Sequence, residues 1–410
     1  MKKLVGVLAV LLIVYSNHPA NSATNGTPGT EGLAVKVFSS VGQCSGAVWQ
    51  NTIVITSAHC VLSKSGVLAT GINVKSLKSG SETYSEVVGV KIPREFSSDS
   101  VNVYGQTSYG DIAFLILKTK LWNSVYFPTL RFATATDWEI YRTTPTWLEI
   151  ISYGSTSEAV EDSSPNAPIS TMHYTNTVLS SGTKDWGVVN SSKSAICNGD
   201  SGAPVVYFRE AENALVLVGI VTSASGVTGK CGVFQFGTST TSFTKLSSYP
   251  GLIASTLNTE SKYRSGALVL ERATASLTNY EKNFSDLEEF VNQLPSATKK
   301  RLFDNNKNVN RLNKSITDYK SAVSTQEEVL NKSMDFAFIN SGILEANSTE
   351  VGYTIGQTLA PYQEKIESQL INISKTLPSA VCIRNNQITN LLPNKKCVKG
   401  FVRTDLTKPF

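Results

Sequence analysis

The sequence contains few charged residues and no dense run of one sign. Asp, Glu, Lys and Arg make up 17% of its 410 residues, and the formal net charge at pH 7 is +5. So mild an excess, without a Lys/Arg stripe, argues against nucleic acid as a partner. The hydrophobic share of 41% excludes a wholly disordered chain. At this length one hydrophobic core is not enough, so we expect about two domains.

Long apolar runs are also missing, because no segment reaches the ~18 uninterrupted apolar residues of a membrane-spanning helix. The apolar run from Leu4 to Val14 follows Lys2 and Lys3 and precedes the small residues of Ala20 to Ala23. This pattern is typical of a secretory signal peptide, and the run is too short for the alternative, a membrane anchor. We expect residues 1–22 to be removed and the protein to be extracellular or periplasmic, without a membrane span.

Histidine and cysteine are scarce. The three histidines are His18, His59 and His173, and His18 lies in the leader, so the mature chain has two candidates for a catalytic base. The six cysteines are an even number, which in an exported chain indicates disulfides whose pairing the count alone leaves open. No cofactor or metal site is expected.

Before residue 259 the chain consists of short runs rich in Val, Ile, Thr, Tyr and Phe, separated by Gly, Ser, Asn and Pro. Such runs predict strands of a sandwich or barrel rather than alternating βαβ units. Examples are Leu33 to Phe38, Thr52 to Thr56, Ile112 to Leu117, Val205 to Phe208, Leu215 to Thr222 and Val233 to Phe236.

From about residue 268 apolar residues recur at steps of three and four, which predicts amphipathic helices in a hairpin or small bundle. The three series span Leu277–Leu294, Val309–Leu330 and Leu359–Leu377; Gly342, Gly352 and Gly356 are expected in the connection before the third helix. Residues 259–410 carry no catalytic motif. The apolar stripes are interpreted as bundle interior, with self-association or a surface partner as the alternative.

Three segments of the β-rich part carry residues with catalytic chemistry: Thr56–Cys60, Tyr109–Leu115 and Cys197–Pro204. They supply His59, Asp111 and Ser201 in that order. A serine hydroxyl becomes a good nucleophile when a histidine accepts its proton, and a buried carboxylate orients the imidazole. The alternatives are a structural histidine beside a disulfide, ordinary turn aspartates and a turn serine. His173, in a polar segment, is interpreted as a surface histidine.

These segments resemble the chymotrypsin/trypsin family of serine endopeptidases. The matching motifs are Ser57–Cys60, Asp111–Ala113 and Gly199–Pro204, and the resemblance covers residues 23–258. It implies two six-stranded antiparallel β-barrels and a short closing helix at Tyr249–Leu257, ahead of the helical region 259–410. It also implies proteins or peptides as substrates.

The resemblance assigns further roles. It implies an oxyanion hole from the backbone N–H groups of Gly199 and Ser201, an N-terminal amine paired with Asp200, and a specificity pocket with Ala195, Ala224 and Gly232. A neutral pocket floor predicts preference for apolar residues before the scissile bond. It implies the disulfides Cys44–Cys60 and Cys197–Cys231, which leaves Cys382 and Cys397 for a C-terminal loop. Ala23 replaces the usual Ile or Val of the new N-terminus.

We therefore expect a secreted serine endopeptidase with a helical accessory domain. Two alternatives remain at this point. One is a non-catalytic protease homologue that acts as a binding scaffold. The other is an adhesion or assembly protein that acts through its helical domain and uses the protease for self-processing.

Overall fold

The computed structural model describes the chain in segments, and the leader lies outside them. The described residues are 27–28, 33–63, 65–78, 81–96, 110–121, 129–144, 146–154, 173–182, 185–191, 196, 199–209, 212, 214–225, 239–294, 307–333, 337–339, 351–377, 380–384, 387–391 and 402–405. The chain divides into two compact units. The first unit is Met1–Glu260 with Met334–Ala346, and the second is Ser261–Ser333 with Asn347–Phe410.

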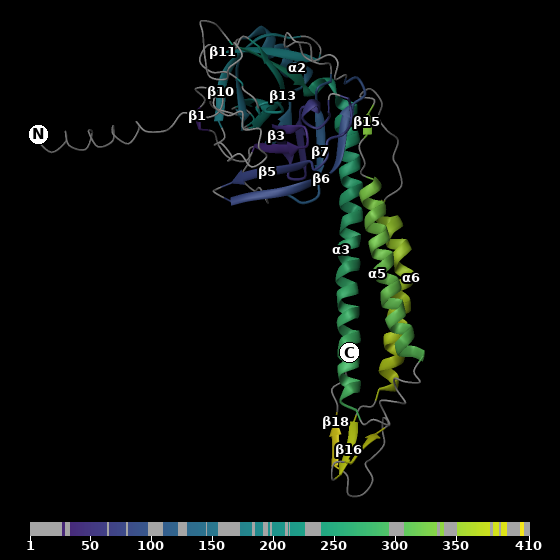
Figure 1. Ribbon diagram of the computed structural model, residues 1–410. Helices are drawn as coiled ribbons and strands as arrows, with labels where there is room; N and C mark the ends of the chain where they lie inside the picture. The colour runs from purple at the N-terminus through teal and green to yellow at the C-terminus, as the bar shows by residue number, and fades with distance from the viewer. Residues whose placement is uncertain are drawn as a thin grey trace, which may run out of the picture. The chain divides into compact units, whose positions relative to one another are not determined.

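The first barrel is a closed ring of six antiparallel strands (Figure 1). Pairing runs β6–β5–β2–β3–β4–β7 and returns from β7 to β6. In β7, Leu115 and Leu117 fill the barrel interior, whereas Phe114 faces a second core, as expected when successive side chains point to opposite faces. The strands are β2 (Ala34–Ser39), β3 (Gly42–Gln50), β4 (Ile53–Thr56), β5 (Asn73–Lys78), β6 (Ser81–Pro93) and β7 (Ala113–Leu117).

The second barrel closes in the same way, through the pairings β10–β11–β14–β13–β12–β9 and back to β10. Its strands are β9 (Trp147–Ser152), β10 (His173–Gly182), β11 (Trp186–Ser191), β12 (Pro204–Arg209), β13 (Ala214–Ser225) and β14 (Ser239–Lys245). Two further strands join its rim: β1 (Thr27–Pro28) pairs with β10, and β8 (Thr129–Phe132) runs parallel to β13. The predicted pair of six-stranded barrels, followed by helices, is confirmed.

A hydrophobic core lies between the barrels. It contains Ala47 and Phe114 from the first barrel and Val206 and Leu217 from the second. Trp49 packs edge-on against Phe114, with ring centroids 5.9 Å apart. Burial of this shared face fixes the loops of the first barrel, which carry His59 and Asp111, against the loop of the second barrel that carries Ser201.

One helix within this unit, α2 (Ala135–Thr143), was not predicted from the sequence. Its start is a capping box in which Thr134 and Asp137 bond each other's backbone N–H groups. Arg131 donates two hydrogen bonds to Asp137, at 2.6 and 3.0 Å, and holds the pKa of that carboxyl well below its usual range. The helix was not predicted because it has only nine residues, too few apolar ones among them to show a helical period.

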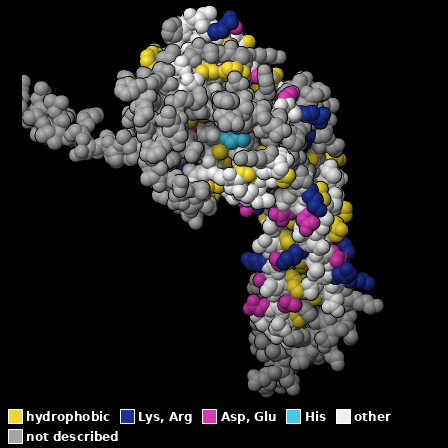
Figure 2. Space-filling model, turned by 45° about the horizontal axis from the view of Figure 1, so that its top comes forward, with side chains coloured by type: hydrophobic (Ala, Val, Ile, Leu, Met, Phe, Trp, Pro, Cys, Tyr) yellow, Lys and Arg dark blue, Asp and Glu magenta, His cyan; other side chains and the backbone are white. Residues whose placement is uncertain are grey.

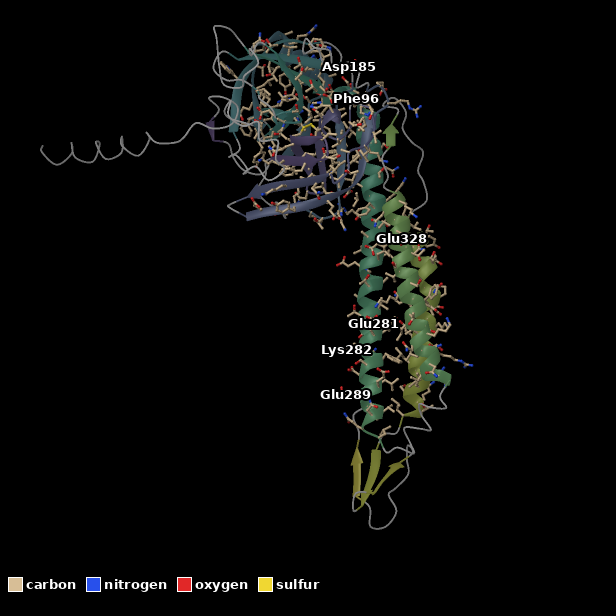
Figure 3. The ribbon with its side chains drawn as sticks, viewed as in Figure 1. Phe96, Asp185, Glu281, Lys282, Glu289 and Glu328 are labelled. Atoms are coloured by element: carbon tan, nitrogen blue, oxygen red, sulfur yellow. A yellow bond between two sulfur atoms is a disulfide. The ribbon has the colours of Figure 1, made fainter. Side chains whose placement is uncertain are left out.

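The second unit is built on three helices that run alongside one another (Figure 1): most of α3 (Pro250–Asn292), all of α5 (Lys307–Ser333) and α6 (Val351–Thr376). The buried Tyr319 hydroxyl donates to the Ala273 carbonyl at 3.2 Å and accepts from Gln363 at 2.7 Å. Glu281, Lys282 and Glu289 lie on exposed positions of α3 (Figure 3). A three-stranded antiparallel sheet follows: β16 (Ala380–Arg384), β17 (Gln387–Leu391) and β18 (Val402–Asp405).

Two helix predictions need correction. The short closing helix expected at Tyr249–Leu257 is only the beginning of α3, which continues without a break to Asn292 because no proline interrupts residues 251–292. Gly352 and Gly356, placed in a connection, lie inside α6. At Gly352 the helices approach closely, since a Cβ there would lie 2.1 Å from Ser265 Oγ and 2.8 Å from the Ser265 carbonyl oxygen.

The connection after α5 contains an additional strand. There, β15 (Ala337–Ile339) pairs in parallel with Lys91–Pro93 of β6, so this part of the chain adds a strand to the first barrel. None of the helices in the described segments combines the length and apolar character of a bilayer span.

Candidate active site

His59 is presented by a turn at the end of a fully buried strand. After β4 the chain makes a single 3-10 turn at Ala58–Cys60, and Cys60 is bonded to Cys44 on β3. The Cys44–Cys60 disulfide that the resemblance implied is thus confirmed. The side chain of His59 is 33% exposed, and a histidine is visible at the surface in Figure 2.

Asp111 lies two residues before the start of β7 and is almost completely buried, with 2% of its surface exposed. Its two carboxylate oxygens both bind His59: Oδ1 accepts the backbone N–H at 3.0 Å, and Oδ2 lies 2.7 Å from Nδ1. Thr244 on β14 donates to the backbone carbonyl of Asp111 at 3.2 Å. One buried carboxylate therefore fixes both the position and the ring orientation of the histidine.

The electrostatics of this pair favour a protonated imidazole. Burial alone would lower the pKa of His59, but the charge of Asp111 and its hydrogen bond outweigh burial and raise the pKa above its ordinary 6.5. The second nitrogen, Nε2, is then the atom of the ring left to exchange protons.

Ser201 lies in a tight turn before β12. Gly199 and Gly202 on either side adopt φ of +90° and +84°, which other residues rarely adopt. Gly202 also has no room for a side chain, because a Cβ would lie 2.1 Å from Thr56 Oγ1 and 2.2 Å from the Ser45 carbonyl oxygen. Asp200 is fully buried, whereas Ser201 is partly exposed.

Hydrogen bonds join this turn to the turn that carries His59. The Val221 carbonyl on β13 accepts the N–H of Gly202 at 2.8 Å and the hydroxyl of Ser57 at 2.7 Å. Thr56 Oγ1 donates to the Ser45 carbonyl at 2.7 Å, and the Ser45 N–H donates to the Ser201 carbonyl at 2.8 Å. Each of these hydrogen bonds involves a residue that is at most three positions from His59 along the chain, or at most one position from Ser201.

The buried carboxylate of Asp200 accepts the backbone N–H of Gly154 at 2.7 Å. Its predicted partner, the amine of Ala23, lies outside the described residues. The nearby strand β1 pairs Pro28 with His173, and His173 in turn pairs with Ser152, two residues before Gly154.

Most of the predicted pocket falls on residues that are not described. Ala195, Gly232, Cys197, Cys231 and Cys397 lie outside the described segments. Ala224 is placed by its backbone on β13, opposite Thr241, and Cys382 on β16. Their assignments remain predictions.

The hydroxyl groups of Ser45, Thr56 and Ser57 were not predicted to have a role. All three are completely buried, and Thr56 and Ser57 stand within the segment that contains His59. The sequence feature that could have indicated a role is the presence of hydroxyl residues next to Cys44 and shortly before His59, where apolar strand residues would otherwise be expected.

Among the described residues, one group of three potential metal ligands exists: Cys44, His59 and Cys60, with ligand atoms within 4.8 Å of one another. The two sulfur atoms are joined in a disulfide, so only the imidazole remains as a ligand. This set does not fit a metal ion.

A profile of the trypsin family matches residues 23–246. The chain belongs to the trypsin family. The match covers both barrels and ends within the 3-10 turn at Leu246–Ser248, just before α3. No curated protein sequence matches the chain significantly. The trypsin family is a family of serine proteases, and family membership implies proteins as substrates.

Proposed function

We propose that this trypsin-family protein is a secreted serine endopeptidase whose catalytic groups are Ser201, His59 and Asp111. The observation that carries the proposal is the double hydrogen bond of the buried Asp111 carboxylate to His59. It gives the imidazole the tautomer and orientation that a general base requires.

In the proposed reaction Ser201 Oγ attacks the carbonyl carbon of the scissile peptide bond while its proton passes to His59 Nε2. The negative charge that develops on the carbonyl oxygen is stabilised by the N–H groups of Gly199 and Ser201. When the C–N bond breaks, His59 returns the proton to the leaving amine, which leaves an acyl group on Ser201. Water then releases this acyl group by the same proton transfers.

The proposal includes export and activation. Removal of residues 1–22 would expose Ala23, whose amine we expect to pair with Asp200 and order the oxyanion turn. The pairing of β1 with β10 supports this, because it places Thr27, four residues after Ala23, on the barrel that holds Asp200. Sequencing the N-terminus of the secreted protein tests the idea, and a start well downstream of residue 23 contradicts it.

The proposed specificity is for an apolar residue before the scissile bond, because Ala195, Ala224 and Gly232 offer no charge to a Lys or Arg side chain. Profiling with a peptide library tests this preference. Strong cleavage after Lys or Arg would contradict the pocket assignment without affecting the catalytic residues.

Peptide hydrolysis by the secreted full chain and by Ser201→Ala tests the activity itself. We expect hydrolysis by the wild type and a loss of at least about 1000-fold in the variant, since the nucleophile is removed. Equal rates in the two proteins would exclude Ser201 as nucleophile. A wild type without hydrolysis would favour the non-catalytic homologue.

A further inference from the structure

A buried serine of the first barrel contacts the oxyanion turn of the second. Ser45 follows the disulfide-bonded Cys44 on β3, and none of its surface is exposed. Its backbone pairs with Lys36 of β2, so the residue is held firmly in the first barrel.

The hydroxyl of Ser45 makes two hydrogen bonds, and both partners lie on the second barrel's side of the core. It accepts the backbone N–H of Tyr153 at 3.0 Å and donates to the Gly199 carbonyl at 2.9 Å. The backbone N–H of the same residue donates to the Ser201 carbonyl at 2.8 Å. Ser45 therefore holds the chain on both sides of Asp200.

We propose that Ser45 is a positioning residue for the oxyanion hole, an inference that rests on the proposed function. Fixing the Gly199 carbonyl fixes the peptide plane that joins Gly199 to Asp200, so the Gly199 N–H can move only by rotation about φ and ψ of Gly199. Acceptance from Tyr153 orients the Ser45 hydroxyl, since an oxygen that accepts one bond has a restricted direction for its own proton. The hydroxyl thereby holds the turn in the shape that directs two N–H groups at the substrate carbonyl.

Substitution of Ser45 by alanine removes the donor to Gly199 while keeping the Ser45 N–H bond to Ser201. The turn then relaxes at Gly199, and donors misplaced by about 1 Å stabilise the transition state poorly. We expect kcat on a peptide amide to fall about 10- to 100-fold. Complete removal of one oxyanion-hole donor costs more, about 100- to 1000-fold in kcat. KM is expected to stay unchanged, because the turn acts on the transition state.

Ser85→Ala provides a matched control. Ser85 is also a buried serine of the first barrel, and its hydroxyl accepts from the Thr119 N–H and donates to the Thr119 carbonyl, both at 3.0 Å. Its partner Thr119 follows the end of β7, whereas Asp111 precedes the start of that strand, so the strand separates the two residues. This variant loses the same kind of bonds and should keep wild-type kcat.

The experiment measures kcat, KM and the pH profile of kcat/KM per titrated active site in the full secreted chain. Wild-type activity that depends on Ser201 is established first, and its absence would be a failure of the proposed function alone. A fall in kcat for Ser45→Ala, with KM and the His59 pKa unchanged, supports the positioning role. A wild-type kcat, or a fall shared by Ser85→Ala, overturns it.

Ser45→Gly removes the same hydroxyl and gives a second measurement if Ser45→Ala does not fold. Failure of both variants to fold would make Ser45 a purely structural residue and overturn the proposal.

Discussion

Asp111 directs both of its carboxylate oxygens to a single residue. A carboxylate that bonds a backbone N–H and a ring nitrogen of the same histidine fixes the turn as well as the ring. The side chain of Asp111 is buried, whereas the side chain of His59, the proposed base, is one-third exposed to solvent. Such an arrangement shields the acid while keeping the proton-transfer atom accessible.

Asp111→Asn tests this arrangement. An amide can keep the geometry but favours the wrong imidazole tautomer, so we expect kcat to fall about 10,000-fold at neutral pH. Steady-state kinetics measure the loss, and circular dichroism checks that the fold is retained. A loss below tenfold would mean that Asp111 does not orient the base.

The raised pKa of His59 predicts the pH dependence of activity. The base must be neutral, so kcat/KM should rise with pH through a pKa above 6.5. The same shift stabilises the folded state while His59 is protonated; this contribution is complete below pH 6.5 and is lost as pH rises through the raised pKa. A pH profile with its acidic limb below 6.5 would contradict the assignment.

At this scale the sequence predicted His59, Asp111 and Ser201 because their types and motifs are specific to one chemistry. It did not predict the hydrogen bonds of Ser45 to the turn of Ser201, because a serine in a strand has no distinguishing pattern. The bonding partners of its hydroxyl, Tyr153 and Gly199, lie more than 100 residues away along the chain, and only folding brings them together.

At the scale of elements, two glycines of α6 offer a matched pair. A Cβ at Gly352 would lie 2.8 Å from backbone atoms of Ser265 on α3, whereas a Cβ at Gly356 would meet only Val269 Cγ1 at 3.9 Å. The close approach of α6 to α3 at Gly352 is therefore possible only without a side chain there, whereas at Gly356 there is room for one.

Gly352→Ala should lower the free energy of unfolding of the helical unit by about 1–2 kcal/mol, because overpacking exceeds the gain in helix propensity. Gly356→Ala should raise it by about 0.5–1 kcal/mol, since alanine restricts the unfolded chain. Thermal unfolding followed by circular dichroism measures both. Stabilisation by Gly352→Ala would show that the helices are not in close contact there.

The apolar periods predicted α5 and α6, and the β-rich runs predicted β2, β4, β7, β12 and β13. The sequence could not predict the continuity of α3, because its first turns pack on the core between the barrels. Leu252 and Ile253 there pack with residues from distant strands, so these turns belong to the core of the first unit while the later turns pack within the second. The connecting strand β15 was missed because three residues carry too little pattern.

At the scale of the whole molecule, the chain forms two units with separate cores. We expect two calorimetric transitions.

Removing the first unit's disulfide by Cys44→Ala/Cys60→Ala should lower that unit's unfolding free energy by about 3 kcal/mol, given a sequence separation of 16. Gly352→Ala should shift the other transition only. A single transition that both variants shift equally would contradict two cooperative units.

We have proposed that Ser201 is the nucleophile of an exported protease. Treatment of the secreted full chain with a fluorophosphonate probe, followed by mass spectrometry to locate the adduct, tests this role of Ser201 directly. We predict one adduct, on Ser201, that disappears in Ser201→Ala and forms far more slowly in His59→Ala. A folded wild-type protein that forms no adduct, or forms it on another residue, would contradict the assignment of Ser201 as nucleophile.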